Sequence, residues 1–192
     1  MTATPGRPRS FEPEDVLAKA LEVFWRTGYR ATTTRMLEKE LGLSQSSIYN
    51  AFGSKRQLLL AALTTYEDQI TTELVGPLEH AEDGLVGVHR FFDDLARWVT
   101  DGGKRGCMII NLMAEDAGES DEITKRTRAY RERVRSALEG ALSHSDVPDA
   151  APKADLLYGM VLGLNIAARG GGLTEEVERL VGSAHAVVAS WT

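Results

Sequence analysis

Residues 34–52 read TRMLEKELGLSQSSIYNAF and contain two short helical segments around a tight turn. Gly42 lies in that turn and can adopt a left-handed backbone conformation that residues with a Cβ resist. The threonines at 32–34 offer an N-cap for a helix over 35–41, and Ser44 predicts the cap of a helix that reaches about Ala51. Apolar side chains at positions 37, 43 and 48 would lock these helices at a steep angle, as in a helix-turn-helix.

The second of these helices is expected to expose polar side chains. They are Gln45, Ser46, Ser47, Tyr49 and Asn50. In a helix-turn-helix the second helix lies in the major groove of DNA, where short hydrogen-bonding side chains meet base edges and phosphates. An ordinary corner between two helices has the same spacing, so the pattern alone leaves both interpretations open.

Helical periodicity continues on both sides of this segment. Apolar residues from Val16 to Trp25 form one stripe, and Gly28 suits the position just past the end of that helix. Ser54 predicts the cap of a long helix that ends before Gly76-Pro77.

The rest of the chain also reads as helices. Further helices are predicted near 85–101, 106–116, 121–143, 156–168 and 177–191. We find no run of alternating apolar and polar residues that would predict a strand. The fold class is therefore predicted as all-α, with about nine helices.

Charge is distributed unevenly along the 192 residues. The net charge is -6, but residues 1–60 hold nine Lys or Arg against six Asp or Glu, which gives +3 and leaves -9 for the remainder. A mildly basic N-terminal part followed by an acidic C-terminal part is typical of a nucleic-acid-binding domain joined to a second domain. We therefore expect two domains, 1–60 and 61–192.

Several classes of protein are disfavoured by the sequence. Cys107 is the only cysteine, so no disulfide framework or zinc-thiolate cluster is expected. The first ten residues have no apolar stretch typical of a secretory signal. The longest uncharged apolar stretch, Leu156 to Ala168, falls short of the ~20 residues that span a bilayer. We expect a cytoplasmic protein without a membrane partner.

Several motifs resemble the tetracycline-repressor (TetR) family of bacterial regulators. They are Gly28-Tyr29-Arg30-Ala31-Thr32-Thr33-Thr34, Leu41-Gly42-Leu43-Ser44 and Ser47-Ile48-Tyr49-Asn50-Ala51-Phe52-Gly53-Ser54-Lys55. The resemblance covers roughly residues 9–63. It implies a homodimer of all-helical subunits, in which 1–60 binds DNA and 61–192 binds a ligand and dimerises.

The resemblance also implies DNA-contacting residues. Thr33 and Thr34 would contact phosphate, and Tyr49 and Lys55 would do the same. Bases or nearby phosphates would be met by Gln45, Ser46, Ser47 and Asn50. Arg7 and Arg9 lie in an arm that either adds phosphate or minor-groove contacts or is a solvated tail. Two positions depart from the family pattern: Glu38 replaces a usual alanine, and Ser46 a frequent glycine.

A ligand pocket is expected among the fifth to eighth helices, as the family architecture implies. Its candidate lining residues, each of which could instead be core, are Phe91, Trp98, Cys107, Met108, Asn111, Met113 and Tyr158. Cys107 has a second interpretation, because the basic Lys104 and Arg105 beside it would favour a reactive thiolate.

The last two helices predict a dimer interface. Small residues recur every four positions at Gly159, Gly163 and Ala167, and the last helix has a broad apolar face. The candidate interface residues on that last helix are Val177, Leu180, Val181, Ala184, Val188 and Trp191. Two such helices from each subunit would make a four-helix bundle, and its two-fold symmetry would match a palindromic operator. A helix pair within one subunit is the alternative for some of these positions.

These observations together predict a homodimeric repressor that a small, largely apolar molecule releases from double-stranded operator DNA. The alternatives are a redox or electrophile sensor acting through Cys107, and a helical dimer that does not bind DNA. The chain's histidines, at 80, 89, 144 and 185, are scattered without metal-ligand spacing. We therefore expect no catalytic residue, no metal ligand and no cofactor, and the chain is not expected to be an enzyme.

Overall fold

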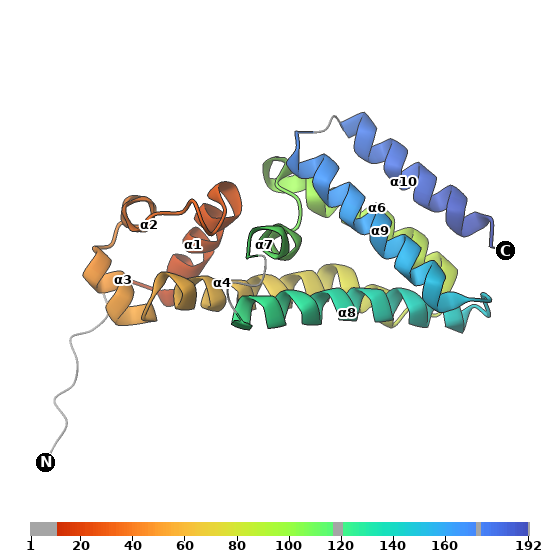
Figure 1. The fold of residues 1–192 in the computed structure, drawn as a ribbon, viewed down its shortest axis with the longest axis horizontal. Coiled ribbons are helices and arrows are strands. Elements are labelled where there is room, and N and C mark those ends of the chain that lie inside the picture. Colours follow the sequence, from red (N-terminus) through yellow and green to blue (C-terminus); the bar gives the residue numbers. More distant parts are fainter. Residues whose placement is uncertain (1–10, 117–120, 172–173, 192) are drawn as a thin grey trace, which may run out of the picture. The chain divides into compact units, whose positions relative to one another are not determined.

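The protein is all-helical, as the sequence predicts. A computed structural model describes residues 11–116, 121–171 and 174–191, and in these residues helices are joined by short turns with no strand. The chain divides into two compact units between Tyr66 and Glu67. Figure 1 labels the helices of both units.

The N-terminal unit holds three helices and the beginning of a fourth. These are α1 (Pro13–Thr27), α2 (Thr34–Leu41), α3 (Gln45–Phe52) and α4 (Lys55–Ile70). The predicted caps are confirmed, because the Thr33 hydroxyl accepts a hydrogen bond from the Met36 amide at 3.3 Å and Ser44 accepts one from Ser47 at 3.2 Å. Gly42 has a φ of 66° between α2 and α3. Fully buried side chains from all four helices form the core, among them Phe24, Leu37, Ile48 and Leu58.

α4 ends at Ile70, before Gly76-Pro77 as predicted, but the helical backbone does not stop at that pair. After α4 the chain continues through a π-helical segment, Thr71–Val75, into the short helix α5 (Gly76–Glu79). The Gly76 amide donates to the Thr71 carbonyl, five residues earlier. Pro77 lies in the first turn of α5, a position that tolerates proline.

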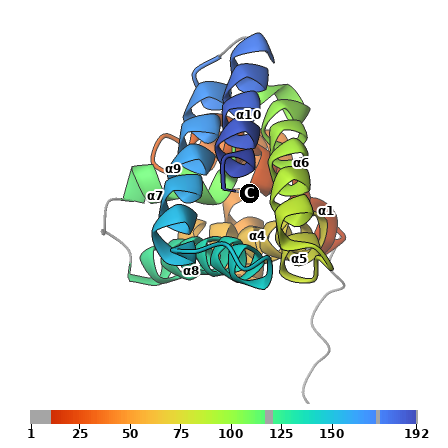
Figure 2. The ribbon, with the colours of Figure 1, turned by 90° about the vertical axis from the view of Figure 1, so that its right-hand side faces the viewer.

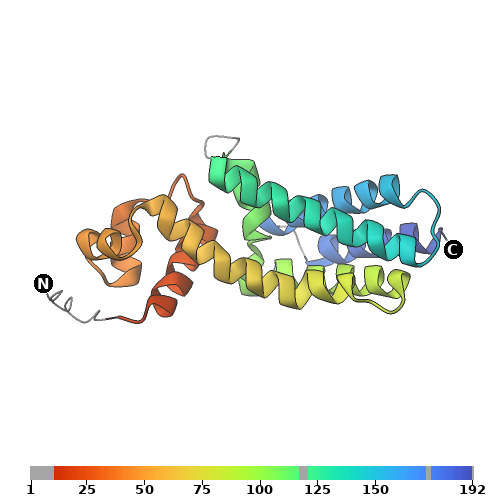
Figure 3. The ribbon, with the colours of Figure 1, turned by 90° about the horizontal axis from the view of Figure 1, so that it is seen from below.

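After α5, the described part of the C-terminal unit contains five more helices. They are α6 (Gly84–Lys104), α7 (Met108–Asp116), α8 (Asp121–His144), α9 (Ala150–Arg169) and α10 (Thr174–Ala189). Helices α6, α9 and α10 lie side by side, and α8 packs against both α9 and α6 (Figures 2 and 3). α9 begins at Ala150, before the predicted 156, because the prediction counted only the uncharged apolar stretch. In the part of the chain that the structure describes, no helix is long and apolar enough to cross a membrane.

The start of α6 comes very close to α8. A Cβ placed on Gly84 would lie 1.8 Å from the carbonyl oxygen of Ala141. The amide of the next residue, Leu85, donates to the Ser145 hydroxyl at 3.1 Å, which links the same two helices. This approach therefore requires a residue without a side chain at position 84.

Candidate DNA-binding surface and effector cavity

Helix α3 exposes three of the five polar side chains that the sequence indicated, and the other two, Ser47 and Tyr49, are half-buried. The exposed three are Gln45, Ser46 and Asn50. Ile48 on the opposite side is fully buried in the core. The helix therefore has a fixed inner side and a polar outer side with hydrogen-bonding groups of the kind that read base edges.

A hydroxyl pair joins α2 to α3. The Thr34 hydroxyl lies 2.8 Å from the Tyr49 hydroxyl, and both side chains are half-buried. Thr33 is exposed, although its oxygen already caps α2. The structure thus brings together three of the predicted DNA contacts, Thr33, Thr34 and Tyr49. The hydroxyl pair of Thr34 and Tyr49 fixes the angle between α2 and α3.

Glu38 has a partner at the start of α3. Its Oε1 accepts a hydrogen bond from the Gln45 amide at 2.7 Å, and the Gly42 turn brings the two residues together. The carboxylate satisfies an amide that has no partner within its own helix, and it meets the positive end of the helix dipole. The residue that departs from the family pattern therefore tethers α3, which sequence spacing alone did not reveal.

Lys55 is directed into its own unit. Its Nζ donates to the backbone carbonyls of Tyr29 at 2.8 Å and Thr32 at 2.7 Å, and it lies 4.7 Å from the centroid of the Tyr29 ring. Burial lowers the pKa of Lys55 below its ordinary value. The ammonium thus fastens the loop that leads into α2, a role that the resemblance did not imply.

Two predicted contacts, Arg7 and Arg9, lie outside the described residues. A further basic residue was not among the predicted contacts. Arg35 is exposed in the first turn of α2, directly after Thr34. Its position beside two predicted phosphate contacts was the signal that could have identified it.

A largely apolar cavity of about 510 Å³ lies between α7 and α9. Its lining residues are Ile110, Asn111, Met113, Ala114, Glu115, Leu162, Asn165, Ile166, Arg169 and Gly170. Of the seven predicted ligand-binding residues, Asn111 and Met113 are among them. Arg169 and Glu115 form an ion pair of 3.0 Å at this cavity and neutralise each other. The size and the apolar lining suit a small organic molecule.

Two buried amides hold the start of α7 against α9. Asn165 accepts a hydrogen bond from the Cys107 amide and donates to the Asn111 side chain at 3.2 Å. Asn111 in turn donates to the Arg105 carbonyl at 2.8 Å. These amides make structural hydrogen bonds as well as lining the cavity.

The other predicted ligand-binding residues are not among those that line this cavity. Phe91, Cys107 and Met108 are buried, and Trp98 is half-buried. The Cys107 side chain is 0% exposed, which does not favour the alternative of a thiol sensor, because reactive cysteines are partly exposed.

Tyr158 is buried with an unsatisfied hydroxyl. Among the residues that the structure describes, no group makes a hydrogen bond with this hydroxyl. Burial raises the pKa of Tyr158 to about 12, so the group remains a donor near neutral pH. On α9, Tyr158 precedes the cavity residues Leu162 and Asn165 by four and seven positions, a spacing that places all three on one side of the helix.

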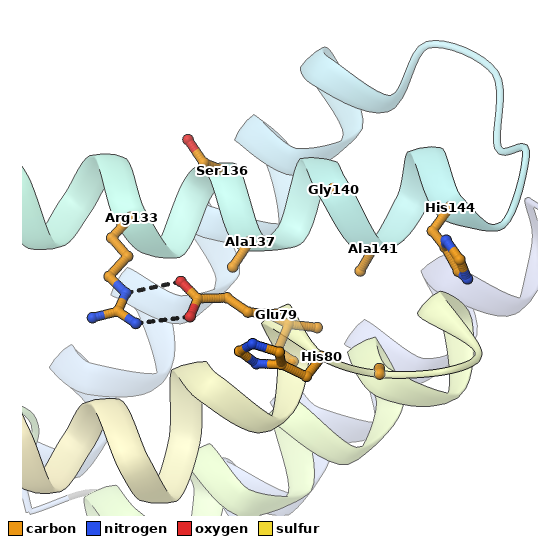
Figure 4. A pocket seen from close by; sticks show the side chains of 10 residues that line it. Glu79, His80, Arg133, Ser136, Ala137, Gly140, Ala141 and His144 are labelled. Atoms are coloured by element: carbon orange, nitrogen blue, oxygen red, sulfur yellow. Dashed lines mark hydrogen bonds and ion pairs between the residues drawn. The ribbon is translucent and has the colours of Figure 1, made fainter.

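A second hollow, of about 470 Å³, lies between α5 and α8 and is more polar (Figure 4). Glu79 and Arg133 face each other across it through hydrogen bonds of 2.8 and 2.7 Å. These bonds lower the pKa of Glu79, with the positive charge of Arg133 adding to the effect. Because the two charges neutralise each other, the hollow offers a ligand little net charge.

The predicted dimer residues fall into two groups. Gly159 and Gly163 border open space on α9, and Leu180 on α10 is 36% exposed. They share a hollow of about 420 Å³ with Leu156, which is 51% exposed. We call this set, with the 70% exposed Ile166, the α9–α10 face.

The second group is covered within the subunit. Its buried members are Val177, Val181, Ala184 and Val188. Ala167 is half-buried, and so is Trp191, whose ring lies 5.1 Å from Lys153 Nζ. The apolar stripe of α10 therefore packs largely inside its own subunit, and a partner subunit is not needed to cover it.

Comparisons with known proteins agree with this arrangement. The sequence profile of "Bacterial regulatory proteins, tetR family" matches residues 16–62. The HTH-type transcriptional repressor ComR of Escherichia coli (strain K12) is 27% identical over 187 residues, which cover 93% of this chain and 89% of ComR. The uncharacterized HTH-type transcriptional regulator YezE of Bacillus subtilis (strain 168) is 29% identical over 140 residues, 72% of this chain and 70% of YezE.

A solved structure is similar over almost the whole chain. It is a cysteine mutant of the TetR family transcriptional regulator CifR, complexed with 26-bp double-strand operator DNA. It has a TM-score of 0.84 and 25% identity and covers 97% of this chain and 100% of that one. The likeness therefore includes both units, beyond the residues that the family profile matches.

Proposed function

The chain belongs to the TetR family of bacterial regulatory proteins, and from this premise we propose that it is a homodimeric repressor released from its operator by a small, largely apolar molecule. The exposed polar side of α3 carries this proposal, because it lies on a helix fixed by the buried Ile48, by the Thr34–Tyr49 hydroxyl pair and by the bond between Glu38 and the Gln45 amide. The operator is double-stranded and palindromic, and the compartment is the cytoplasm. We assign no catalytic residue.

The proposed base contacts are Gln45, Ser46, Ser47 and Asn50. Thr33 and Arg35 would contact phosphate at the start of α2, where free amides and the helix dipole favour an anion. Thr34, Tyr49 and Lys55 would act mainly by holding the helices that carry these contacts, and Arg7 and Arg9 would add arm contacts.

Gln45→Ala and Asn50→Ala should each change which bases the protein prefers. A lost bidentate base contact reduces discrimination by roughly 10-fold or more at that position. The measurement is footprinting on DNA upstream of the protein's own gene, followed by titration of operator variants. Gln57→Ala is the control, since it removes an equally exposed glutamine from α4. An unchanged base preference in both α3 variants would contradict the assignment.

Lys55→Met should destabilise the N-terminal unit by about 1–2 kcal/mol, since two carbonyls lose a charged donor. Thermal unfolding followed by circular dichroism measures this loss. Arg56→Met, at the exposed neighbouring position, should leave stability within about 0.5 kcal/mol. If Lys55 instead acted only on phosphate, its loss would lower the salt dependence of DNA binding and leave stability unchanged.

We propose that the cavity between α7 and α9 binds the effector. Tyr158 does not line this cavity in the unliganded protein, and we propose that binding opens the cavity toward its buried hydroxyl, which then donates a hydrogen bond to a polar atom of the effector. The unsatisfied hydroxyl on the same side of α9 as Leu162 and Asn165 supports this assignment. A buried hydroxyl without a partner costs about 1–3 kcal/mol, and an acceptor on the effector would remove that cost. Binding would then favour a conformation that no longer fits the operator.

Tyr158→Phe should therefore leave the unliganded protein as stable as the parent, or up to about 1 kcal/mol more stable. The same change should weaken release from the operator by an effector found in a compound screen. Unfolding curves and operator titrations with the effector measure the two effects. A loss of more than about 1 kcal/mol in stability would mean that the hydroxyl has a partner in the folded protein.

A further inference from the structure

Two histidines that lie 96 residues apart in the sequence meet between α6 and α10. The Nδ1 atoms of His89 and His185 are 2.6 Å apart, and their ring centroids are 4.8 Å apart. Both helices are in view in Figure 2, where they run alongside each other. Two imidazole nitrogens from separate helices therefore face each other at hydrogen-bond distance.

Asp93 determines which nitrogen of His185 faces His89. Asp93 Oδ1 lies 2.9 Å from His185 Nε2 and accepts a hydrogen bond from its N–H, so the other ring nitrogen, Nδ1, faces His89. A carboxylate on the far nitrogen of an imidazole is the arrangement that orients histidines bound to metal ions.

The spacing of the two nitrogens suits a shared ion after a small movement. Their separation is shorter than the ~2.9 Å usual for a hydrogen bond from nitrogen. Two nitrogens bound to one metal ion at about 2.0–2.1 Å lie about 2.9–3.4 Å apart in square or tetrahedral geometry. The His185 side chain is 31% exposed, so an ion and its waters can reach the pair.

We propose that His89 and His185 bind a divalent late transition-metal ion through their Nδ1 atoms, with Asp93 as a positioning residue. In the described residues no group of three or more His, Cys, Asp or Glu side chains could hold a metal ion, so water completes the coordination. Imidazole ligands favour Ni²⁺, Cu²⁺ and Zn²⁺ over Mg²⁺ and Ca²⁺, which prefer oxygen. The site is separate from the effector cavity between α7 and α9.

Calorimetric titration of the full-length protein with Ni²⁺ tests the site. We expect one ion per chain, and His89→Gln and His185→Gln should each weaken binding at least about 10-fold. Asp93→Asn should weaken it by a similar factor, because the outer partner of a ligand histidine contributes about 10- to 100-fold. His144→Gln is the matched control. The imidazole of His144 lies on α8, where its Nε2 is 3.0 Å from the backbone carbonyl of Glu82, and its loss should leave Ni²⁺ binding unchanged.

A second measurement needs no variant. The electron paramagnetic resonance spectrum of the wild-type protein with one Cu²⁺ per chain should show hyperfine coupling to two imidazole nitrogens. This spectrum decides the question if a histidine variant fails to fold. Unweakened binding in both histidine variants, loss of binding in His144→Gln, or a Cu²⁺ spectrum without nitrogen coupling would each overturn the proposal. Binding of Mg²⁺ with equal affinity would overturn it as well.

Discussion

The double variant Leu156→Glu/Ile166→Glu should be monomeric and should bind a full palindromic operator about 10²- to 10⁴-fold more weakly than the parent. Both side chains lie on the α9–α10 face and are 51% and 70% exposed in the single subunit. If a partner subunit packs on this face, the double variant buries four added carboxylates in the dimer. Taking these charges out of water costs a large free energy of association, which should keep the subunits apart. Each monomer would then meet its half-site without the gain from a linked second half-site.

Size-exclusion chromatography with light scattering and operator titration measure the two effects. Val86→Glu is the matched control, since Val86 is an apolar residue with 62% exposure on α6 and does not belong to the α9–α10 face. This control should remain dimeric and bind DNA as the parent does. A double variant that stays dimeric would show that the subunits associate through another surface.

Gly84→Ala should destabilise the C-terminal unit by about 3 kcal/mol, at the upper end of the range for overpacked sites. The new Cβ would meet the Ala141 carbonyl, which belongs to helix backbone and cannot rotate away as a side chain can. The start of α6 would have to move off α8 and would lose the hydrogen bond from Leu85 to Ser145.

Chemical unfolding of Gly84→Ala, beside the control variant Gly140→Ala and the parent, measures the change in the free energy of unfolding. Gly140→Ala lies on α8, where a Cβ would have nothing within 4 Å. That control should be more stable than the parent by about 0.5–1 kcal/mol, because alanine favours the helix. Equal stability of Gly84→Ala and the parent would mean that α6 and α8 are further apart in solution.

Local signals in the sequence were enough to predict the helix-turn-helix. Thr33, Gly42 and Ser44 each act within a few residues through caps and a left-handed turn, and the structure has all three in these roles. The π-helical segment was missed, since Gly76-Pro77 normally ends a helix and the wider turn before it has no marker in the sequence.

Contacts between residues far apart in the sequence could not be predicted from the periodicity of apolar residues. Positions 89 and 185 share no sequence motif, and only the packing of α6 on α10 brings these two histidines together. Lys55 reaches back 26 residues to Tyr29, and no spacing rule predicts a lysine that fastens a loop. On α10 an apolar stripe has the same periodicity whether its own subunit or a partner covers it.

The carboxylate of Glu38 at the start of α3 has a consequence for the search along the chromosome. A fixed negative charge at the amino end of the recognition helix weakens attraction to every phosphate alike, whatever the sequence nearby. A genome offers about 10⁶–10⁹ competing sites, so occupancy of the correct one depends on the ratio of specific to nonspecific affinity. We expect this carboxylate to shorten the time spent on wrong sites and so to leave more of the protein free to find its operator.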